Sequence, residues 1–177
     1  MSLTGKPQLT TNAPLTNDGF WPALVVGDFV SKYRIPPEYD DGVISWGLSL
    51  GMIRVNKHLA SAKEQCLNPQ LLDTTKPLQP IYLTLDAFAA TRSEQVEGEE
   101  VIVRQYKHAC YCMAKAYLLQ QFNTMNRRPQ AENLKKESPD AEDYWLNQAQ
   151  WAINWILKEI VPGMATTSDF GVYVELI

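Results

Sequence analysis

The sequence predicts a mainly α-helical protein: a small bundle of about four helices with long connecting loops and a short C-terminal β-strand. Apolar residues recur at helical spacing over most of the chain, and helix start and stop residues separate these stretches. Only residues 170–177 show a clear alternation with period two, which is typical of a strand. A chain of 177 residues with 45% hydrophobic and 20% charged residues is large enough for one globular domain with a buried core.

We divide the chain into three parts. Residues 1–19 are expected to form a disordered N-terminal arm, because Thr, Asn, Pro, Gly and Lys dominate its sequence and leave little apolar surface to bury. Residues 20–163 form the helical domain. Residues 164–177 form a C-terminal tail that contains the terminal strand.

The first helix of the domain is expected to be short. Asp28 is a suitable N-cap residue, and Pro36 and Pro37 must end the helix because proline lacks the amide donor. The second helix opens at Asp40 or Asp41 and continues to about residue 66. One face of this second helix carries a core stripe at helical spacing, made of Ile44, Leu48, Met52, Val55, Leu59, Ala62 and Cys66.

A second apolar stripe lies roughly opposite the first on this helix, and only in its first half. Gly47 and Gly51, one turn apart, lower the helix propensity, so we expect another helix to pack closely there. The first half of the helix therefore needs cover on two sides. The second stripe consists of Val43, Trp46, Leu50 and Ile53.

The stretch 67–98 is a long connection with three prolines and one short apolar piece, 81–85, which predicts a brief strand or a turn of helix. A connection of this length either serves binding or conceals an unrecognised element. The third helix starts after Gly98, where Glu99 and Glu100 match the positive end of the helix dipole, and fades near residue 126. Its buried face is expected to contain Ile102, Tyr106, Ala109, Met113, Ala116 and Tyr117.

The fourth helix is expected to begin with Ser138 as N-cap and Pro139 at the first helical position, and to end at Val161. Apart from one narrow polar stripe, nearly all its side chains are apolar, which exceeds what a surface helix of a monomer needs. Part of it therefore faces another subunit, or the helix lies centrally within one bundle. The residues expected at the subunit interface are Tyr144, Trp151, Trp155 and, on the second helix, Trp46.

The terminal strand, 170–177, has no obvious partner in a helical fold. We expect it to add to a sheet edge of a neighbouring chain or of another protein. The alternative is internal pairing with 81–85. The side chains expected to dock are those that alternate along the strand, Phe170, Val172, Val174 and Leu176.

The net charge of −4 argues against a protein that coats duplex DNA. At most, a polar loop over 123–137 touches phosphate weakly. The basic residues of this loop are Arg127, Arg128, Lys135 and Lys136.

No apolar run reaches bilayer length, and the N-terminus lacks the order of a signal peptide, so we expect a cytoplasmic protein without membrane contact.

The sequence offers no catalytic, cofactor-binding or metal-binding constellation. Cys110 and Cys112 point in nearly opposite directions on a helix, and Cys66 lies on a core face. His58 and His108 belong to different helices, without a neighbouring ligand at a recognised spacing. Phosphate-binding, dinucleotide-binding and nucleophile-elbow motifs are missing from the sequence, so we expect no enzyme.

The order of features over residues 20–177 resembles the head completion family of contractile-tailed phages, a branch of the head–tail connector proteins. The resemblance implies a small helical protein that docks as a ring on the portal after DNA packaging, completes the head and provides the site for tail attachment. It also implies the portal, a tail-completion or neck protein and further copies of this chain as partners. The residues that carry it are Phe20, Trp21 and Pro22, then Glu97, Gly98 and Glu99 leading into Val103, Arg104, Gln105, Tyr106, Lys107, His108 and Ala109, and finally Trp145, Trp151, Ala152 and Ile153.

This resemblance implies no cofactor and no reaction. It places the protein in the bacterial host cytoplasm during assembly and then in the neck of the virion, with at most weak, non-specific contact with packaged DNA. Two alternatives stay open: a small terminase-like DNA-packaging or DNA-recognition subunit, and an unrecognised α-helical enzyme. The terminase alternative needs a basic recognition helix, whereas the third helix carries only Arg104, Lys107 and Lys115 on its outer side.

Overall fold

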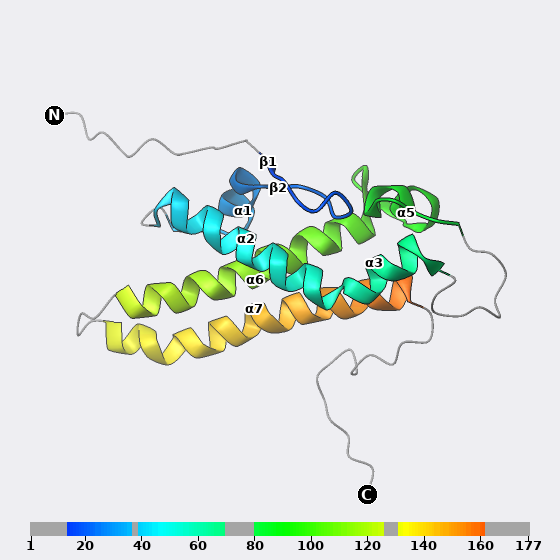
Figure 1. The fold of residues 1–177 in the computed structure, drawn as a ribbon. Helices are drawn as coiled ribbons and strands as arrows, with labels where there is room; N and C mark the ends of the chain where they lie inside the picture. The colour runs from blue at the N-terminus through cyan, green and yellow to red at the C-terminus, as the bar shows by residue number, and fades with distance from the viewer. Residues whose placement is uncertain (1–13, 37–38, 70–79, 126–130, 162–177) are drawn as a thin grey trace, which may run out of the picture.

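The fold is mainly α-helical, as predicted (Figure 1). The computed structural model describes residues 14–36, 39–69, 80–125 and 131–161. Its helices are α1 (Val26–Lys32), α2 (Asp41–His58), α3 (Ala60–Leu67), α5 (Leu85–Arg92), α6 (Val101–Met125) and α7 (Ala131–Ile160). Two short antiparallel pairs accompany them: β1 (Pro14–Leu15) with β2 (Leu24–Val25), and β3 (Gln95–Val96) with β4 (Glu99–Glu100).

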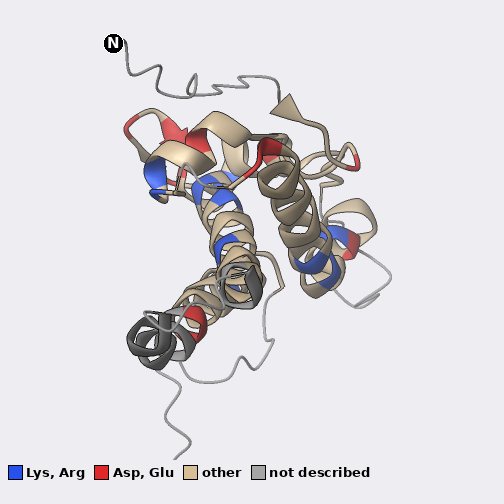
Figure 2. Ribbon diagram, turned by 90° about the vertical axis from the view of Figure 1, so that its left-hand side faces the viewer, with Lys and Arg blue, Asp and Glu red and all other residues tan. Residues whose placement is uncertain are grey.

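Helix α6 is the centre of the bundle. It packs against α2 and against α7, and the two views of Figures 1 and 2 show it between these helices. A central helix must be apolar on several sides, and α6 buries more than the predicted face. Of that face, Tyr117 alone is only half-buried. The additional buried residues are Val103, Cys110, Tyr111, Cys112, Ala114 and Leu118.

The core stripe predicted for the second helix is confirmed, since all seven of its residues are buried. Asp40 is the N-cap, and its carboxylate accepts a hydrogen bond of 2.8 Å from the Gly42 amide. The prediction of one continuous helix to residue 66 is wrong. Leu59, with φ −95° and ψ 14°, leaves helical geometry and separates α2 from α3. Its side chain is fully buried, so the change of direction keeps the stripe on the core.

The close helix contact predicted at Gly47 and Gly51 is also confirmed. A Cβ atom on Gly51 would lie 2.7 Å from the Cys110 carbonyl oxygen of α6. At Gly47 it would meet only side-chain atoms, at 3.2 Å, from Tyr117 and Leu118. The α6 backbone therefore approaches α2 most closely at Gly51.

The described fold begins earlier than the expected start at Phe20. β1 pairs with β2, and Asn17 donates a hydrogen bond of 2.7 Å to the Tyr106 hydroxyl, which itself donates to Asn56 at 2.6 Å. Trp21 stacks on the Tyr106 ring with 4.9 Å between centroids. These long-range contacts order a segment whose composition is typical of an arm.

The N-cap assignment of Asp28 is wrong. Helix α1 starts at Val26, so Asp28 lies in the first turn and forms an ion pair with Lys32 at 3.1 Å. The structure gives the N-cap position to Val25, which makes no side-chain capping hydrogen bond. The negative charge of Asp28 therefore stabilises the first turn of α1 at the positive end of the helix dipole, and no side chain caps this helix.

The long connection conceals unrecognised elements. The piece 81–85 is neither a strand nor a full turn of helix: α5 starts at its last residue, and the Thr84 hydroxyl caps α5 by accepting from Ala87 at 3.1 Å. Residues 95–100, which include Glu97, Glu99 and Glu100, then form the β3–β4 hairpin. Its two turn residues, Glu97 and Gly98, have φ of +54° and +76°, which matches a two-residue hairpin turn with both central residues left-handed.

Helix α7 begins at Ala131, seven positions before the expected start at Ser138. The preceding segment is rich in helix-forming Ala, Glu, Leu and Lys, and this propensity prevails over the local start signal of Ser138 and Pro139. The C-terminal end at Ile160 agrees with the prediction. Lys135 and Lys136 therefore belong to the α7 backbone and not to a loop.

Candidate subunit interface

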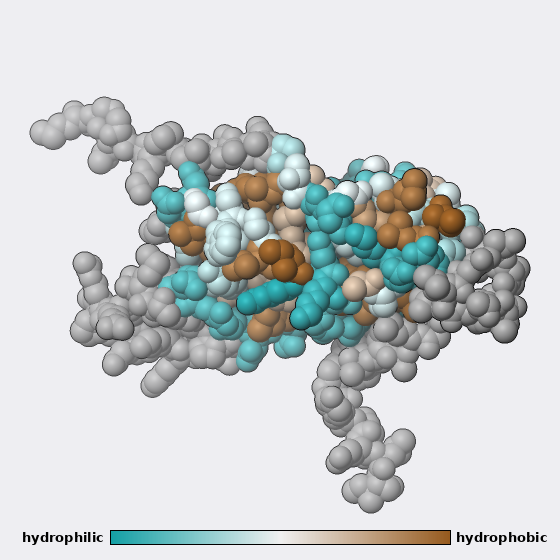
Figure 3. All heavy atoms as spheres, in the orientation of Figure 1, coloured by the Kyte–Doolittle hydropathy of each residue, from teal (hydrophilic) through white to brown (hydrophobic). Residues whose placement is uncertain are grey.

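An exposed row of apolar side chains follows the outer face of α2. We call Val43, Trp46, Leu50 and Ile53 the α2 ridge. Trp46 is 61% exposed and Ile53 63% exposed, although the ridge lies on a helix that also carries the core stripe. Figure 3 shows hydrophobic surface over α2 on the face turned to the viewer. Three residues of the second apolar stripe, Val43, Trp46 and Ile53, are thus exposed, and Leu50 is half-buried.

Basic residues accompany the C-terminal end of the α2 ridge. Arg54 and Lys57 are both exposed, and neither forms an ion pair within the described part of the chain. The ridge therefore combines aromatic and aliphatic surface with positive charge.

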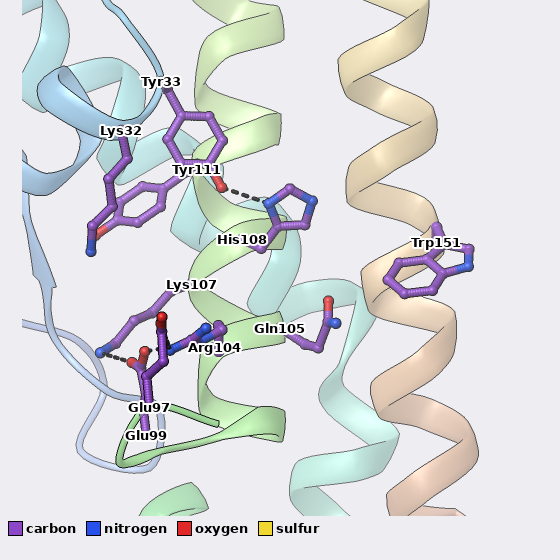
Figure 4. Close-up of a pocket in the computed structure, with 10 residues that line it drawn as sticks. All are labelled: Lys32, Tyr33, Glu97, Glu99, Arg104, Gln105, Lys107, His108, Tyr111 and Trp151. Atoms are coloured by element: carbon purple, nitrogen blue, oxygen red, sulfur yellow. Dashed lines mark hydrogen bonds and ion pairs between the residues drawn. The ribbon is translucent and has the colours of Figure 1, made fainter. Parts of the chain in front are cut away.

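A groove of about 430 Å³ lies on the side of α6 that α2 leaves uncovered. We call it the aromatic groove (Figure 4). Trp151 of α7, 42% exposed, forms one wall. Its floor and its other walls come from α1, the β3–β4 hairpin and α6, and its remaining lining residues are Lys32, Tyr33, Glu97, Glu99, Arg104, Gln105, Lys107, His108 and Tyr111.

His108 joins three helices beneath this groove. Its Nδ1 atom lies 2.5 Å from the Tyr33 hydroxyl oxygen of α1, and Gln148 of α7 forms a hydrogen bond with its ring. Burial lowers the pKa of His108, and the Gln148 contact opposes this only in part. Lys115 reinforces the junction by donating to the Tyr33 carbonyl at 2.6 Å while its ammonium lies 4.3 Å from the Trp145 ring centroid. The groove floor is therefore held in place from α1, α6 and α7.

Ion pairs fix the hairpin wall of the groove. Lys107 donates to one oxygen of Glu99 at 2.6 Å, and Arg104 to the other at 3.2 Å. Arg104 also binds the Val96 carbonyl at 3.0 Å and pairs with Glu97 at 3.2 Å. Partial burial acts to raise the pKa of Glu99, but the hydrogen bonds and charges of the two basic residues outweigh it and lower that pKa.

The lowered pKa of Glu99 predicts a loss of stability in acid. In the unfolded chain the Glu99 carboxylate is protonated near pH 4.5, whereas in the folded protein it is protonated only at lower pH. The ion pairs of Glu99 therefore stabilise the fold fully above pH 4.5, and this stabilisation is lost as the pH falls through the pKa of Glu99 in the folded protein. We expect Glu99→Gln to cost up to about 1 kcal/mol at pH 7 and to flatten the pH dependence between neutral and acidic solution. Denaturant unfolding at several pH values measures both, with exposed Glu94→Gln as the control. An equal pH dependence of the free energy of unfolding for wild type and Glu99→Gln would contradict this account.

The four residues expected at a subunit interface lie on different surfaces. Trp46 belongs to the α2 ridge and Trp151 to the aromatic groove. Tyr144, 54% exposed, packs edge-on against its neighbour Trp145, and Trp155 is half-buried against the core. The subunit interface therefore stays a prediction. Its exposed aromatic residues lie on two faces, Tyr144 and Trp151 on α7 and Trp46 on α2.

The other predicted contact residues fall largely outside the described part of the chain. Arg127 and Arg128 lie there, as do the four docking residues of the terminal strand. The groove itself was not predicted. Only the closeness in sequence of the Glu97–Gly98 turn to Arg104 and Lys107 could have indicated its charged wall, because its aromatic residues come from three distant helices.

The cysteines behave as buried structural thiols. All three are free and buried, and burial raises the pKa of Cys66 and of Cys112 to about 12 and that of Cys110 still higher. Cys112 lies 3.6 Å from the ring nitrogens of His108, one helical turn away, a contact that the sequence analysis overlooked. Within the described residues, no group of three or more His, Cys, Asp or Glu could hold a metal ion. None of the helices described is both long and apolar enough to cross a membrane.

Comparison with known proteins identifies the family. Residues 15–160 match the family described as phage head completion protein (GPL). The chain belongs to this family. The match covers most of the chain, including every described helix, and family membership gives the chain a structural role in the phage head.

A curated relative agrees with this membership. The chain is 25% identical to the probable head completion/stabilization protein of Haemophilus phage HP1 (strain HP1c1) over 129 residues, which cover 73% of this chain and 77% of that protein. No solved structure matches this head completion protein.

Proposed function

We propose that this protein is a non-enzymatic virion component that docks as a ring on the portal after DNA packaging, completes the head and provides the site for tail attachment. Family membership over residues 15–160 is the observation that carries the proposal. Its partners are then the portal protein, a tail-completion or neck protein, and further copies of the chain. It works in the host cytoplasm during assembly and afterwards at the head–tail junction of the virion.

The exposed apolar surfaces support an assembly role. Large side chains such as Trp46, Ile53 and Trp151 remain open to solvent on a protein that otherwise has a complete core. Such patches mark sites where other proteins bind. Docking on the portal is assigned to the terminal strand with Phe170, Val172, Val174 and Leu176, which lies outside the described residues.

Contact with DNA is proposed to be weak. The net charge is −4, and on α6 both Arg104 and Lys107 are engaged with Glu99. They are therefore poorly placed to bind phosphate, which disfavours a terminase-like DNA-recognition subunit. The positions 127, 128, 135 and 136 remain the residues proposed to face the DNA.

Deletion of the gene from an inducible phage genome, with the protein supplied from a plasmid, tests the proposed function. Without the protein we expect the DNA to be packaged and cut to full length, but the heads to remain without tails and then to release this DNA. Electron microscopy shows the missing tails, and nuclease protection measures the DNA that is lost. The plasmid should restore infectious particles. Empty heads with uncut DNA would instead indicate a packaging function, and an unchanged titre would overturn any essential role in head completion.

A further inference from the structure

We propose that Arg34 is the centre of a docking surface for an acidic protein of the phage head. The surface, which we call the Arg34 patch, consists of Arg34, Lys115 and the aromatic side chains of Tyr33, Tyr144 and Trp145. The inference rests on the proposed role in head completion and adds a docking surface to the terminal strand. The partner is defined by its chemistry: a carboxylate on a protein surface.

The backbone of Arg34 has a conformation that suits glycine. Arg34 follows the last turn of α1, and its φ of +50° lies in the left-handed region, where a side chain costs free energy. The turn is fixed by a hydrogen bond of 3.1 Å from the Ile35 amide to the Val30 carbonyl and by the buried Ile35 side chain. Glycine is the usual residue at this position after a helix and would form the same turn without strain. The fold therefore does not explain the arginine side chain.

The charge of Arg34 is not balanced within the described part of the chain. Its side chain is exposed and forms no ion pair with a described residue. The dipole of α1 does not require this charge, because Lys32 already lies in the last turn. The guanidinium is therefore open to a carboxylate, which arginine binds through two parallel hydrogen bonds.

A second cation lies near Arg34. Lys115 donates to the Tyr33 carbonyl at 2.6 Å, and its ammonium lies 4.3 Å from the Trp145 ring centroid. Desolvation lowers the pKa of Lys115, the Cys112 thiol opposes this change, and the positive charge of Arg34 lowers the pKa further. The fold thus holds two like charges close enough to repel each other, and a negatively charged partner would relieve this repulsion.

The aromatic side chains around the two cations favour a protein partner over DNA. Tyr33 and Trp145 pack with 5.7 Å between their ring centroids, and Tyr144, 54% exposed, packs against Trp145. Tyrosine, tryptophan and arginine are enriched at the centres of protein interfaces. Binding to duplex DNA depends instead on a surplus of cations, whereas this chain has a net charge of −4. The Arg34 patch therefore fits an acidic protein surface.

The variant Arg34→Gly separates docking from folding. Glycine relieves the left-handed strain, so the midpoint temperature of thermal unfolding should rise by about 3 °C. Binding to the partner should nevertheless weaken by about tenfold or more. The probe is tailless heads from the gene-deletion strain, mixed with labelled protein and recovered by sedimentation. Arg34→Lys keeps the charge but loses the paired hydrogen bonds, so it should bind these heads with intermediate affinity.

Three controls define the chemistry of the partner. Lys63→Gln removes one positive charge from α3, outside the Arg34 patch, and should bind heads like wild type. Added salt should weaken head binding by wild type more than binding by Arg34→Gly, because only wild type has the charged contact. Labelled duplex DNA should bind wild type and Arg34→Gly equally weakly.

Three results would overturn the inference. The first is head binding by Arg34→Gly equal to that of wild type. The second is a lower midpoint temperature for Arg34→Gly, which would show that the arginine serves the fold. The third is a loss of duplex DNA binding in Arg34→Gly, which would make DNA the ligand. In all three cases the proposed function stands, whereas wild-type protein that binds no heads would contradict the proposed function and the inference with it.

Discussion

A protein that ends at Asp169 is expected to fold normally and yet to leave nearly all phage heads without stable closure. The missing residues 170–177 carry the alternating side chains that we assign to docking. A strand that docks on another protein contributes little to the stability of its own fold, so the free energy of unfolding should change by less than about 0.5 kcal/mol. Infectious titre and thermal unfolding of the purified protein measure the two effects.

The alternative to docking is pairing of the terminal strand with 81–85. Two amides of that region are already used, since Tyr82 donates to the Cys66 carbonyl and Leu85 to the Phe20 carbonyl, both at 2.9 Å. This favours docking. A truncated protein that loses several kcal/mol of stability would show that the strand belongs to the fold. As a control, exchange of 166–169 for glycine and serine keeps the reach of the tail and should preserve the titre.

The variant Gly51→Leu should lower the free energy of unfolding by about 3 kcal/mol. Even the first added carbon atom would lie 2.7 Å from the Cys110 carbonyl oxygen, and backbone cannot move aside as a side chain can. The gain of about 1 kcal/mol from replacing glycine within a helix offsets only part of the strain. For a chain of this length the midpoint temperature Tm should then fall by roughly 6–12 °C, measured by calorimetry.

A matched comparison isolates the cause. Gly47→Ala places its methyl group 3.2 Å from movable side-chain atoms of Tyr117 and Leu118, so it should be close to neutral. Gly51→Ala should already destabilise the protein. Equal effects at the two positions would show that the separation of α2 and α6 adjusts freely and that Gly51 is not a required close contact.

Most of the helical core could be predicted from spacing alone. The stripe from Ile44 to Cys66 and the glycines that face α6 follow from a period that the backbone itself imposes. The kink at Leu59 could not be predicted, because it needs no glycine or proline and depends on burial against neighbouring helices. The early start of α7 at Ala131 was missed because the prediction relied on a local cap signal at Ser138. The helix propensity of the residues before Ser138 had the larger effect.

Only part of the candidate interface could be predicted from the sequence. Exposed Trp46 and Trp151 follow from an apolar excess that periodicity reveals. The groove depends on contacts across long sequence separations, such as Tyr33 with His108, 75 positions apart. No local pattern encodes such a pair. Convex surfaces on a single helix can therefore be recognised from sequence, whereas a concave surface built from several elements needs the fold.

The burial of the thiols has a consequence for the life of a phage particle. On the proposed function, the protein assembles in the reducing interior of a bacterium and is then released with the particle into oxygenated surroundings, where exposed thiolates form disulfides or oxidise. Only a thiolate attacks a disulfide, and the thiols of Cys66, Cys110 and Cys112 are both shielded and held protonated. A head completion protein built in this way keeps the same covalent structure on both sides of the cell envelope and does not crosslink one particle to another through these residues.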